Sequence, residues 1–290
     1  MMTPKQTAAY LHLAVTWGFS FVILLNVVHA FGWAGGVAFR GVLAFAMLAL
    51  AARMAGRRLY FTGRWRDLAI VGATTVTAQQ VFLSLAATRI GTAMSSIFVA
   101  AIPLFSMLIA QSMGTERISR SGLAGILIGL AGLVMLVGFP EVPMTGEFLF
   151  GCAAALLSAF FAAYGSNHAS LRLRGVGAVE VTAGASLAGS LFALPLLALF
   201  PVPGPVTIEA LLWLLALAGM VSALNYVIYF RLVAEIGATR TISVEFLVTV
   251  CAVIIGTVLL GESLSLVQFA GAGVIMAGCA LVLGLFGRHA

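Results

Sequence analysis

Charged side chains are scarce in this sequence. Asp, Glu, Lys and Arg together make up 8% of the 290 residues, whereas about 25% is usual in soluble domains. Hydrophobic residues make up 62%, and the mean hydropathy is +1.14. This composition excludes an ordinary soluble protein. Because apolar runs of about 20 residues, enough for a helix to cross a bilayer, follow one another along the chain, we expect an all-α polytopic membrane protein.

Residues that build catalytic and metal sites are equally scarce. Asp67 is the only aspartate, the histidines lack metal-ligand spacing, and the sequence has neither a Walker A loop nor an H-E-x-x-H helix. Cys152, Cys251 and Cys279 lie within apolar runs, as small core residues do. We therefore expect no metal, no cofactor and no enzymatic activity, although a serine nucleophile acting with His168 stays open.

The apolar runs, with their Gly, Pro and Arg boundaries, predict ten transmembrane helices. Their approximate ranges are 8–28, 33–54, 67–87, 91–111, 121–138, 147–168, 178–199, 208–230, 240–259 and 264–285. A signal peptide ending at Ala30 is the alternative for the first run. That run is long enough to span the membrane, however, so we count it as a helix.

The basic residues predict the orientation. If the N-terminus is cytoplasmic, all of the 15 Lys and Arg residues except Arg40 and Arg89 lie on the cytoplasmic side. Such an excess is typical of cytoplasmic loops. We therefore expect a multi-pass protein of the inner (plasma) membrane with both termini in the cytoplasm. The net charge of +6 then reflects topology and requires no nucleic acid.

The chain matches itself at an offset of 146 residues. The matched pairs are Gln79 with Asn225, Ile90-Gly91 with Ile236-Gly237, Glu116 with Glu262, Ser119 with Ser265, Gly125 with Gly271, and Gly132 with Gly278. The matches predict two five-helix halves, residues 1–140 and 141–290, which meet near the turn-prone stretch "GFPEVPMTG". Because five is odd, the second half enters the membrane from the opposite side. Inverted repeats of this kind are typical of transporters.

Three segments carry a resemblance to a known family. They are "AVTWGFSFV" near the start and the paired stretches "IGTAMSSIFVAAIPLFSMLIAQSMGTERISRSGLAGILIGLAGLVMLVG" and "IGATRTISVEFLVTVCAVIIGTVLLGESLSLVQFAGAGVIMAGCALVLG". The chain resembles the two EamA domains of the drug/metabolite transporter superfamily over essentially its full length. The resemblance implies two inverted five-helix units, with the first four helices of each around a central pathway and the fifth at the periphery.

The same resemblance implies a function and includes one departure. Similar proteins export amino acids, other small metabolites or drugs, and the aromatic amino acid exporters of the YddG type are among them. Pro103 has no counterpart in the second half, where Thr249 stands. The two halves therefore need not bend alike.

Polar and aromatic side chains in the middle of spans are the candidate substrate contacts, because an unsatisfied polar group in hydrocarbon costs several kcal/mol. The candidates are Trp17, Gln79, Gln80, Phe82, Ser96, Phe98, Tyr164, Asn167, Asn225, Tyr226 and Tyr229. Amides suit both ends of a zwitterion, and aromatic faces suit apolar groups and ammonium. Interhelical hydrogen bonding is the alternative for the amides, the interfacial aromatic belt for Tyr164, and a bond to its own backbone for Ser96.

Two ionisable groups lie inside the expected spans. We expect Arg40 to meet a substrate carboxylate and Glu245 to bind an ammonium group or a proton. For each, a structural ion pair or a side chain that extends to the interface is the alternative.

Other residues are expected to be structural. In the last helix of each half, glycines spaced three, four and seven apart predict close helix packing. These glycines are Gly125, Gly129, Gly132, Gly271 and Gly278. Glu116 and Glu262 shortly precede those two helices, and we expect each to cap the helix that comes after it.

We therefore predict a secondary transporter that exports small amphipathic metabolites by alternating access. Amino acids with aromatic or large apolar side chains are the expected substrates. An ion or small-solute channel, an exporter of drugs or other metabolites, and a membrane scaffold or sensor are the alternatives. Beyond a small-molecule substrate and the lipid bilayer we expect no partner, and we expect a monomer or a weak homodimer.

Overall fold

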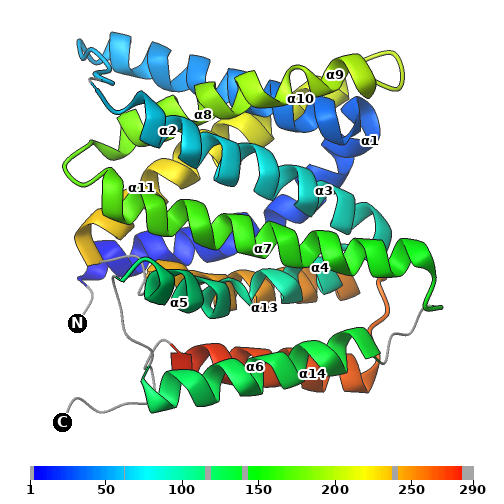
Figure 1. Cartoon of the computed structure of the whole chain (residues 1–290). Helices are drawn as coiled ribbons and strands as arrows, with labels where there is room; N and C mark the ends of the chain where they lie inside the picture. Colours follow the sequence, from blue (N-terminus) through cyan, green and yellow to red (C-terminus); the bar gives the residue numbers. More distant parts are fainter. Residues whose placement is uncertain (1–2, 62, 115–118, 139–142, 237–240, 283–290) are drawn as a thin grey trace.

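The computed structural model describes residues 3–61, 63–114, 119–138, 143–236 and 241–282. Within these ranges every regular element is a helix. The long helices lie beside one another in a bundle, and the first helix begins at the same end of the bundle at which the last one stops (Figure 1).

The first helix, α1 (Pro4–Met54), is a hairpin of two helical arms. It starts at a capping box in which Thr3 and Gln6 each accept the other's backbone N–H. Its 51 residues would make a straight helix of about 76 Å, more than twice the roughly 30 Å of hydrocarbon in a bilayer. At Gly32 the backbone turns to φ 69° and ψ 166°, a conformation that glycine tolerates. The two arms therefore run in opposite directions (Figure 1), and the break falls between the first two expected spans.

The remaining helices follow the expected order. In the first half they are α2 (Trp65–Val71), the π-helix η1 (Gly72–Ala78), α3 (Gln79–Ile90), α4 (Thr92–Val99), α5 (Ile102–Ser112) and α6 (Arg120–Gly138). In the second half they are α7 (Gly146–Arg172), α8 (Ala178–Ala193), α9 (Leu196–Leu199), α10 (Ile208–Ala216), the π-helix η2 (Leu217–Leu224), α11 (Asn225–Ile236), α13 (Val244–Val258) and α14 (Leu266–Val282).

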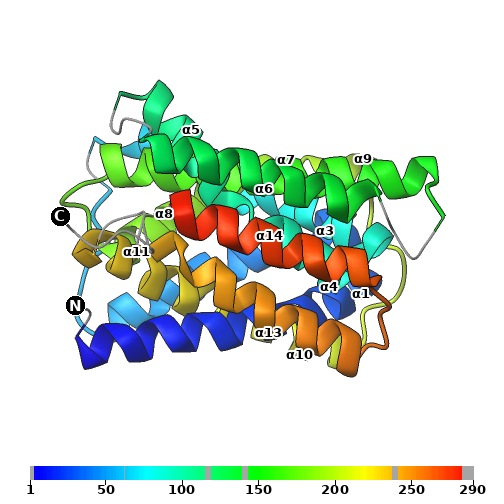
Figure 2. The ribbon, with the colours of Figure 1, turned by 90° about the horizontal axis from the view of Figure 1, so that it is seen from below.

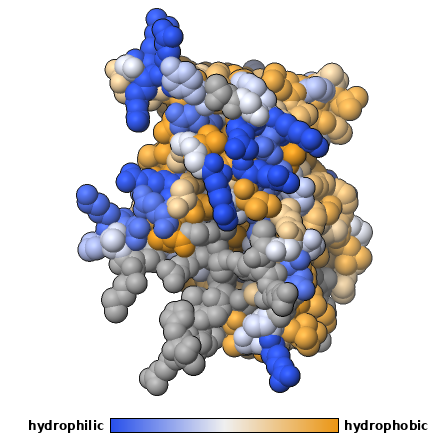
Figure 3. Space-filling model, turned by 60° about the vertical axis from the view of Figure 1, so that its left-hand side comes forward, coloured by the Kyte–Doolittle hydropathy of each residue, from blue (hydrophilic) through white to orange (hydrophobic). Residues whose placement is uncertain are grey.

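Six helical stretches of the described chain are long and apolar enough to cross a membrane. One of these is α1, which is bent, and α6, α13 and α14 are shorter apolar helices. Figure 3 looks toward the end of the bundle where α1 begins, and hydrophilic side chains gather there while hydrophobic ones cover the flank. Arg53, Arg57, Arg58, Arg64 and Arg66 are all exposed.

The two halves bend differently, as expected from Pro103. The α4–α5 stretch is interrupted at Ala100 and Ala101, just before Pro103 in the first turn of α5. Proline has no N–H to give to the preceding turn, so a continuous helix is disfavoured there. In the second half the matched position is Thr249, and α13 continues through it without a break; the turn there comes earlier, at Ser243, directly before α13.

The two π-helices occupy equivalent places in the two halves. Residues 72–78, shifted by the repeat offset of 146, fall on residues 218–224 of η2. In each, a hydroxyl reaches the carbonyl five residues back: Thr77 Oγ1 lies 3.4 Å from Gly72 O, and Ser222 Oγ lies 2.9 Å from Leu217 O. Such wide turns are frequent at functional sites, and each one here directly precedes candidate substrate residues.

The last helices of the two halves, α6 and α14, pack against each other at one side of the bundle (Figures 1 and 2). A Cβ added at Gly132 would lie 2.8 Å from Gly271 O, and one added at Gly278 would lie 2.6 Å from Gly125 O. Only glycine allows this approach of the backbones, so these residues form the close contact that their spacing suggested. The opposite side of α6 exposes leucines and a valine, which suits contact with lipid.

Candidate functional site

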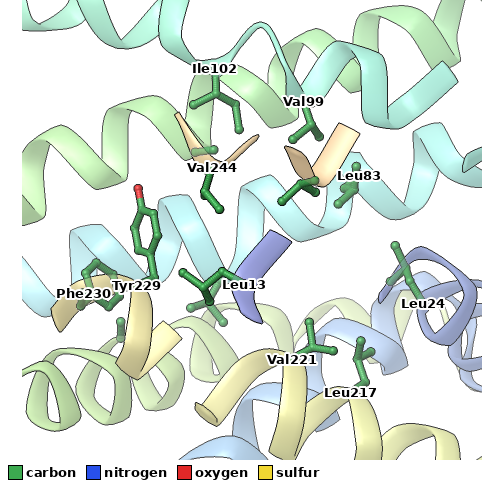
Figure 4. Close-up of a cluster of buried hydrophobic side chains, with 14 of the residues drawn as sticks. Leu13, Leu24, Leu83, Val99, Ile102, Leu217, Val221, Tyr229, Phe230 and Val244 are labelled. Atoms are coloured by element: carbon green, nitrogen blue, oxygen red, sulfur yellow. The ribbon is translucent and has the colours of Figure 1, made fainter. Parts of the chain in front are cut away.

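A cavity lies between helices of both halves, and the empty space in it and at its mouth, part of which is open solvent, is about 770 Å³. Its polar and aromatic lining residues are Trp17, Ser20, Phe21, Arg40, Thr75, Gln79, Gln80, Ser166, Tyr226, Tyr229, Phe230 and Glu245. Its aliphatic lining residues are Leu24, Leu83, Val99, Ile102, Ala162, Leu217, Val221 and Val248. Figure 4 shows how most of the aliphatic ones come together from separate helices, with Tyr229 and Phe230 beside them.

Arg40 is the positively charged residue that lines the cavity, and it is 3% exposed. Its Nε donates to Ser222 Oγ at 2.9 Å, and its Nη1 donates to Gln80 Oε1 at 2.7 Å. The Gln80 Nε2 in turn donates to the Tyr226 hydroxyl at 3.1 Å. Arg40 is therefore held by neutral partners from both halves.

No carboxylate within the described ranges forms an ion pair with Arg40. In the same part of the chain, every side-chain nitrogen or oxygen that is fully shielded has a hydrogen-bond partner. The Arg40 Nη2, which has none among those residues, is therefore accessible from the cavity. A positive charge with a free donor in an apolar surrounding favours an anionic ligand group.

Glu245, in the first turn of α13, is the negatively charged residue of the cavity. Its side chain is half-buried and lines the cavity. Within the part of the chain that the structure describes, no hydrogen bond or ion pair involves its carboxylate, whereas its backbone carbonyl accepts the Thr249 hydroxyl at 2.8 Å. The cavity thus presents both signs of charge without joining them.

Aromatic rings form one wall of the same cavity. Trp17 lies with its ring centroid 5.8 Å from that of Tyr226 and 5.4 Å from that of Tyr229. Tyr229 packs edge-on against Phe230 at 5.5 Å and donates its hydroxyl hydrogen to Ser166 Oγ at 3.1 Å. These rings offer a rigid apolar surface to a ligand.

A family model that describes EamA-like transporters matches the chain twice, over residues 8–138 and 149–284. The chain belongs to the EamA-like transporter family. It is therefore a polytopic membrane transporter whose chain matches the unit of this family twice.

Two relatives match this EamA-like transporter over nearly its whole length, and a third matches about two thirds of it. It is 28% identical to the "Probable terminal-alkyne amino-acid exporter" of Streptantibioticus cattleyicolor, over 97% of this chain and 94% of that protein. It is 25% identical to an "Uncharacterized transporter" of Archaeoglobus fulgidus, over 94% of this chain and 97% of that protein. The "Uncharacterized inner membrane transporter YedA" of Escherichia coli is 28% identical, over 67% of this chain and 62% of that protein. A solved crystal structure superposes with a TM-score of 0.69 at 19% identity, over 97% of this chain and 96% of that one, and supports the fold.

Of the substrate and charge-coupling residues expected from the sequence of this EamA-like transporter, the cavity gathers seven from both halves. They are Trp17, Arg40, Gln79, Gln80, Tyr226, Tyr229 and Glu245. The structure places the other candidates elsewhere.

Three candidates in the first half contact other parts of the protein and do not line the cavity. Phe98 is fully buried in a hydrophobic cluster, and Phe82 stacks on Phe161 at a centroid distance of 5.8 Å. The Ser96 hydroxyl donates to Ala93 O at 2.7 Å, which is the backbone bond that the sequence left open.

The second-half candidates outside the cavity join helices to one another. Asn225 is fully buried and bonds both His12 Nε2, at 3.1 Å, and Thr16 Oγ1, at 2.8 Å. Asn167 donates to Ser106 Oγ at 2.8 Å. For these two amides the structure therefore gives interhelical hydrogen bonds and no cavity contact.

Tyr164 also lies outside the cavity. Its ring stacks on that of His168 at a centroid distance of 6.2 Å. The imidazole of His168 in turn lies 2.9 Å from the Asp67 carboxylate, and no serine hydroxyl bonds it within the described ranges.

Sequence reasoning missed the hydroxyl groups that fix the larger polar residues. Ser222 holds Arg40, and Ser166 holds Tyr229. Small polar residues in apolar runs carry little signal of their own. One usable signal was present, since Gln80 and Tyr226 are separated by the repeat offset and bond each other.

Glu262 caps a different helix from the one expected. Its carboxylate accepts from Thr92 N at 2.7 Å, Ala93 N at 2.6 Å and Thr92 Oγ1 at 2.9 Å, so it caps α4 in the other half. The helix directly after Glu262, α14, has its own capping box between Ser265 and Gln268. Glu116, its repeat counterpart, lies outside the described residues.

Proposed function

We propose that this protein exports amino acids with aromatic or large apolar side chains by alternating access. The observation that carries the proposal is the pair of opposite charges, Arg40 and Glu245, which line one cavity without an ion pair to any described residue. An amino acid has complementary charges at one end. Its carboxylate suits Arg40, its ammonium suits Glu245, and its side chain suits the wall of Trp17 and Tyr229.

Charge neutrality supports a zwitterion over a simple ion. Burial of one uncompensated charge is costly in a low-dielectric bundle, whereas a ligand that brings both signs leaves the filled cavity neutral. A monovalent ion would leave one of the two protein charges without a counterpart. The relative from Streptantibioticus cattleyicolor, whose name describes it as a probable amino-acid exporter, supports the same substrate class and the outward direction.

The proposed topology is ten spans in two inverted five-helix repeats, with both termini in the cytoplasm of the inner membrane. The bend of α1 at Gly32 supports ten rather than nine spans. The exposed arginines near the α1–α2 connection support a cytoplasmic side for that end of the bundle. In this topology the two halves rock around a site near the midplane. One chain contains both repeats, so we propose a monomer or a weak homodimer.

Flux in liposomes that contain the purified protein tests the function. Labelled phenylalanine, phenethylamine, which lacks the carboxylate, and 3-phenylpropionate, which lacks the amine, are compared at equal concentration with empty vesicles as the control. The proposal expects phenylalanine to cross fastest. It also expects unlabelled phenylalanine on the opposite side to accelerate exchange, because a carrier shows counterflow and an open channel does not. Absence of any amino acid flux above empty vesicles would overturn the proposal.

A further inference from the structure

The hydrogen-bond chain from Ser222 through Arg40 and Gln80 to Tyr226 joins the two halves at the repeat axis. Gln80 and Tyr226 are 146 residues apart, which is the offset that relates the repeats, so equivalent positions of the two halves bond each other. Arg40 and Gln80 come from the first half, and Ser222 and Tyr226 come from the second. The orientation of Arg40 therefore depends on both halves.

The donors and acceptors in this chain permit one arrangement. Arginine has donors and no acceptor, so Gln80 must turn its carbonyl oxygen to Arg40 and its NH₂ group to the Tyr226 hydroxyl. Tyr226 thus fixes the Gln80 amide, and Gln80 and Ser222 fix two of the three guanidinium nitrogens. The third nitrogen, Nη2, is left facing the cavity.

We propose that Gln80 and Tyr226 are positioning residues that aim Arg40 at the carboxylate of the substrate. This inference rests on the proposed function and adds a basis for its specificity. A ligand with a carboxylate gains from the aimed guanidinium, and a ligand without one does not. Because these hydrogen bonds cross from one half to the other, the carboxylate site is complete only while the halves keep the arrangement seen here.

The test compares KM and maximal rate for phenylalanine and phenethylamine in liposomes that contain the full chain. Gln80→Glu places a carboxylate on Arg40, and we expect the KM for phenylalanine to rise at least about tenfold, with the KM for phenethylamine unchanged or lower. Tyr226→Phe releases the Gln80 amide, and we expect about a fivefold rise for phenylalanine, the effect of one typical hydrogen bond. Maximal rates should stay within about twofold of the wild-type value.

Gln79→Glu is the matched control, because Gln79 lines the same cavity and has no bond to Arg40. If Gln79→Glu and Gln80→Glu raise the KM for phenylalanine equally, added charge alone explains the effect and the inference is wrong. It is also wrong if Tyr226→Phe affects phenylalanine and phenethylamine alike. If Gln80→Glu does not fold, Tyr226→Phe and Ser222→Ala carry the comparison. Absence of amino acid flux in the wild-type protein would overturn the proposed function as well, which separates the two failures.

A second inference comes from the contact between Glu262 and α4 and does not depend on the substrate. The Glu262 carboxylate, in the α13–α14 connection, receives three hydrogen bonds of 2.6 to 2.9 Å from the start of α4. Room for it is made by two glycines: a Cβ at Gly91 would lie 3.2 Å from its oxygens, and one at Gly256 would lie 2.8 Å from its Oε2. Charge-assisted bonds to helix amides are among the stronger ones.

The chain between this contact and the cavity is tightly packed. The α4 residues from Ala93 to Phe98 are at most 3% exposed, and the Thr249 hydroxyl of α13 bonds Ser96 O at 2.9 Å. The first α4 residue at the cavity is Val99, seven residues or about 10 Å along the helix from Thr92. Along α4, the path between Glu262 and the cavity is therefore closed by packed side chains.

We infer that Glu262 is a latch that holds the halves together at this end and must release before the cavity opens there. Ser96→Cys, in a protein whose native cysteines are replaced, reports opening through its reaction with a membrane-impermeant maleimide from the Glu262 side. Glu262→Gln should raise the labelling rate at least about tenfold, because it weakens three charge-assisted bonds. Gly256→Ala, which inserts a methyl group beside the carboxylate, should act in the same direction.

Glu209→Gln is the control, since Glu209 is an exposed carboxylate in the first turn of α10 and bonds only Trp213 among the described residues. Labelling in this variant should match that of the parent protein. If Glu262→Gln folds and labels at the parental rate, the latch is overturned. If Glu262→Gln is unstable, parental labelling in Gly256→Ala overturns it.

Discussion

The cavity and the closed end at Glu262 differ in how fully the protein satisfies the hydrogen-bonding capacity of their charged groups. In the cavity, Arg40 is held by neutral partners and Glu245 has no described partner on its carboxylate. At the closed end, Glu262 accepts three hydrogen bonds from α4. A charge whose bonding capacity is filled by the protein stabilises one arrangement, whereas a charge with capacity left over can bind a ligand. By this criterion Glu262 is a structural carboxylate, whereas Arg40 and Glu245 are the residues that we propose bind the substrate.

The largest expected effect comes from removing the positive charge of Arg40. Arg40→Met should lower kcat/KM for phenylalanine by about 100-fold or more, because the substrate carboxylate would be buried without a counter-charge. Flux of phenethylamine should persist, which also shows that the variant is folded. Initial rates in liposomes measure both. Equal loss of the two fluxes in a folded protein would mean that Arg40 serves structure alone.

Removing the negative charge of Glu245 should have a smaller effect. Glu245→Gln should raise the KM for phenylalanine about tenfold, since an amide still accepts a hydrogen bond from ammonium but has no charge. Flux of 3-phenylpropionate should not fall, because this acid has no amine to lose a contact.

The same variant distinguishes a proton site from an ammonium site. If Glu245 carries a coupled proton, Glu245→Gln abolishes the response of flux to an imposed pH gradient and leaves the KM unchanged. That result would assign Glu245 to energy coupling and remove it from substrate binding.

The packing of α6 against α14 belongs to neither region and is expected to affect stability alone. Gly278→Ala places a Cβ 2.5 Å from Gly129 N, and we expect a loss of about 1–3 kcal/mol in stability, as for other overpacked contacts. The melting temperature of the detergent-solubilised protein measures this. Gly273→Ala is the control, because no atom lies within 4 Å of the added methyl. Equal melting temperatures for the two variants would contradict the close packing.

The smallest effect is expected from an aromatic residue outside the cavity. Tyr164→Phe should leave phenylalanine KM and maximal rate within about twofold of the wild-type values, because Tyr164 is not among the residues that line the cavity. Tyr229→Phe, which removes the bond to Ser166 inside the cavity, should change KM more. A larger effect of Tyr164→Phe than of Tyr229→Phe would place the substrate elsewhere.

Much of the fold could be predicted because its causes are local in sequence. Apolar runs fix the order of the helices, Gly32 breaks the first one, and Pro103 interrupts the fourth. The glycine spacing in Gly125, Gly132 and their repeat counterparts predicted a close contact, although it did not reveal that the two last helices are each other's partners.

The candidate site could be predicted only in part, because its remaining features depend on helix rotation and on distant partners. A π turn adds a residue and rotates the rest of the helix by about 100° relative to an ideal α-helix. Such a rotation decides which of two consecutive residues faces the cavity: Tyr226 lines it, and Asn225 bonds α1. Glu262 finds its partners 169 and 170 residues away, so sequence neighbours suggested the wrong helix.

A structure of the protein with bound phenylalanine tests the proposed transport site most directly. We predict the ligand carboxylate within hydrogen-bond distance of Arg40 Nη2, its ammonium against the Glu245 carboxylate, and its ring on Trp17 and Tyr229. Phenylalanine bound outside this cavity, or bound inside it with Arg40 and Glu245 paired to each other, would contradict the proposed site.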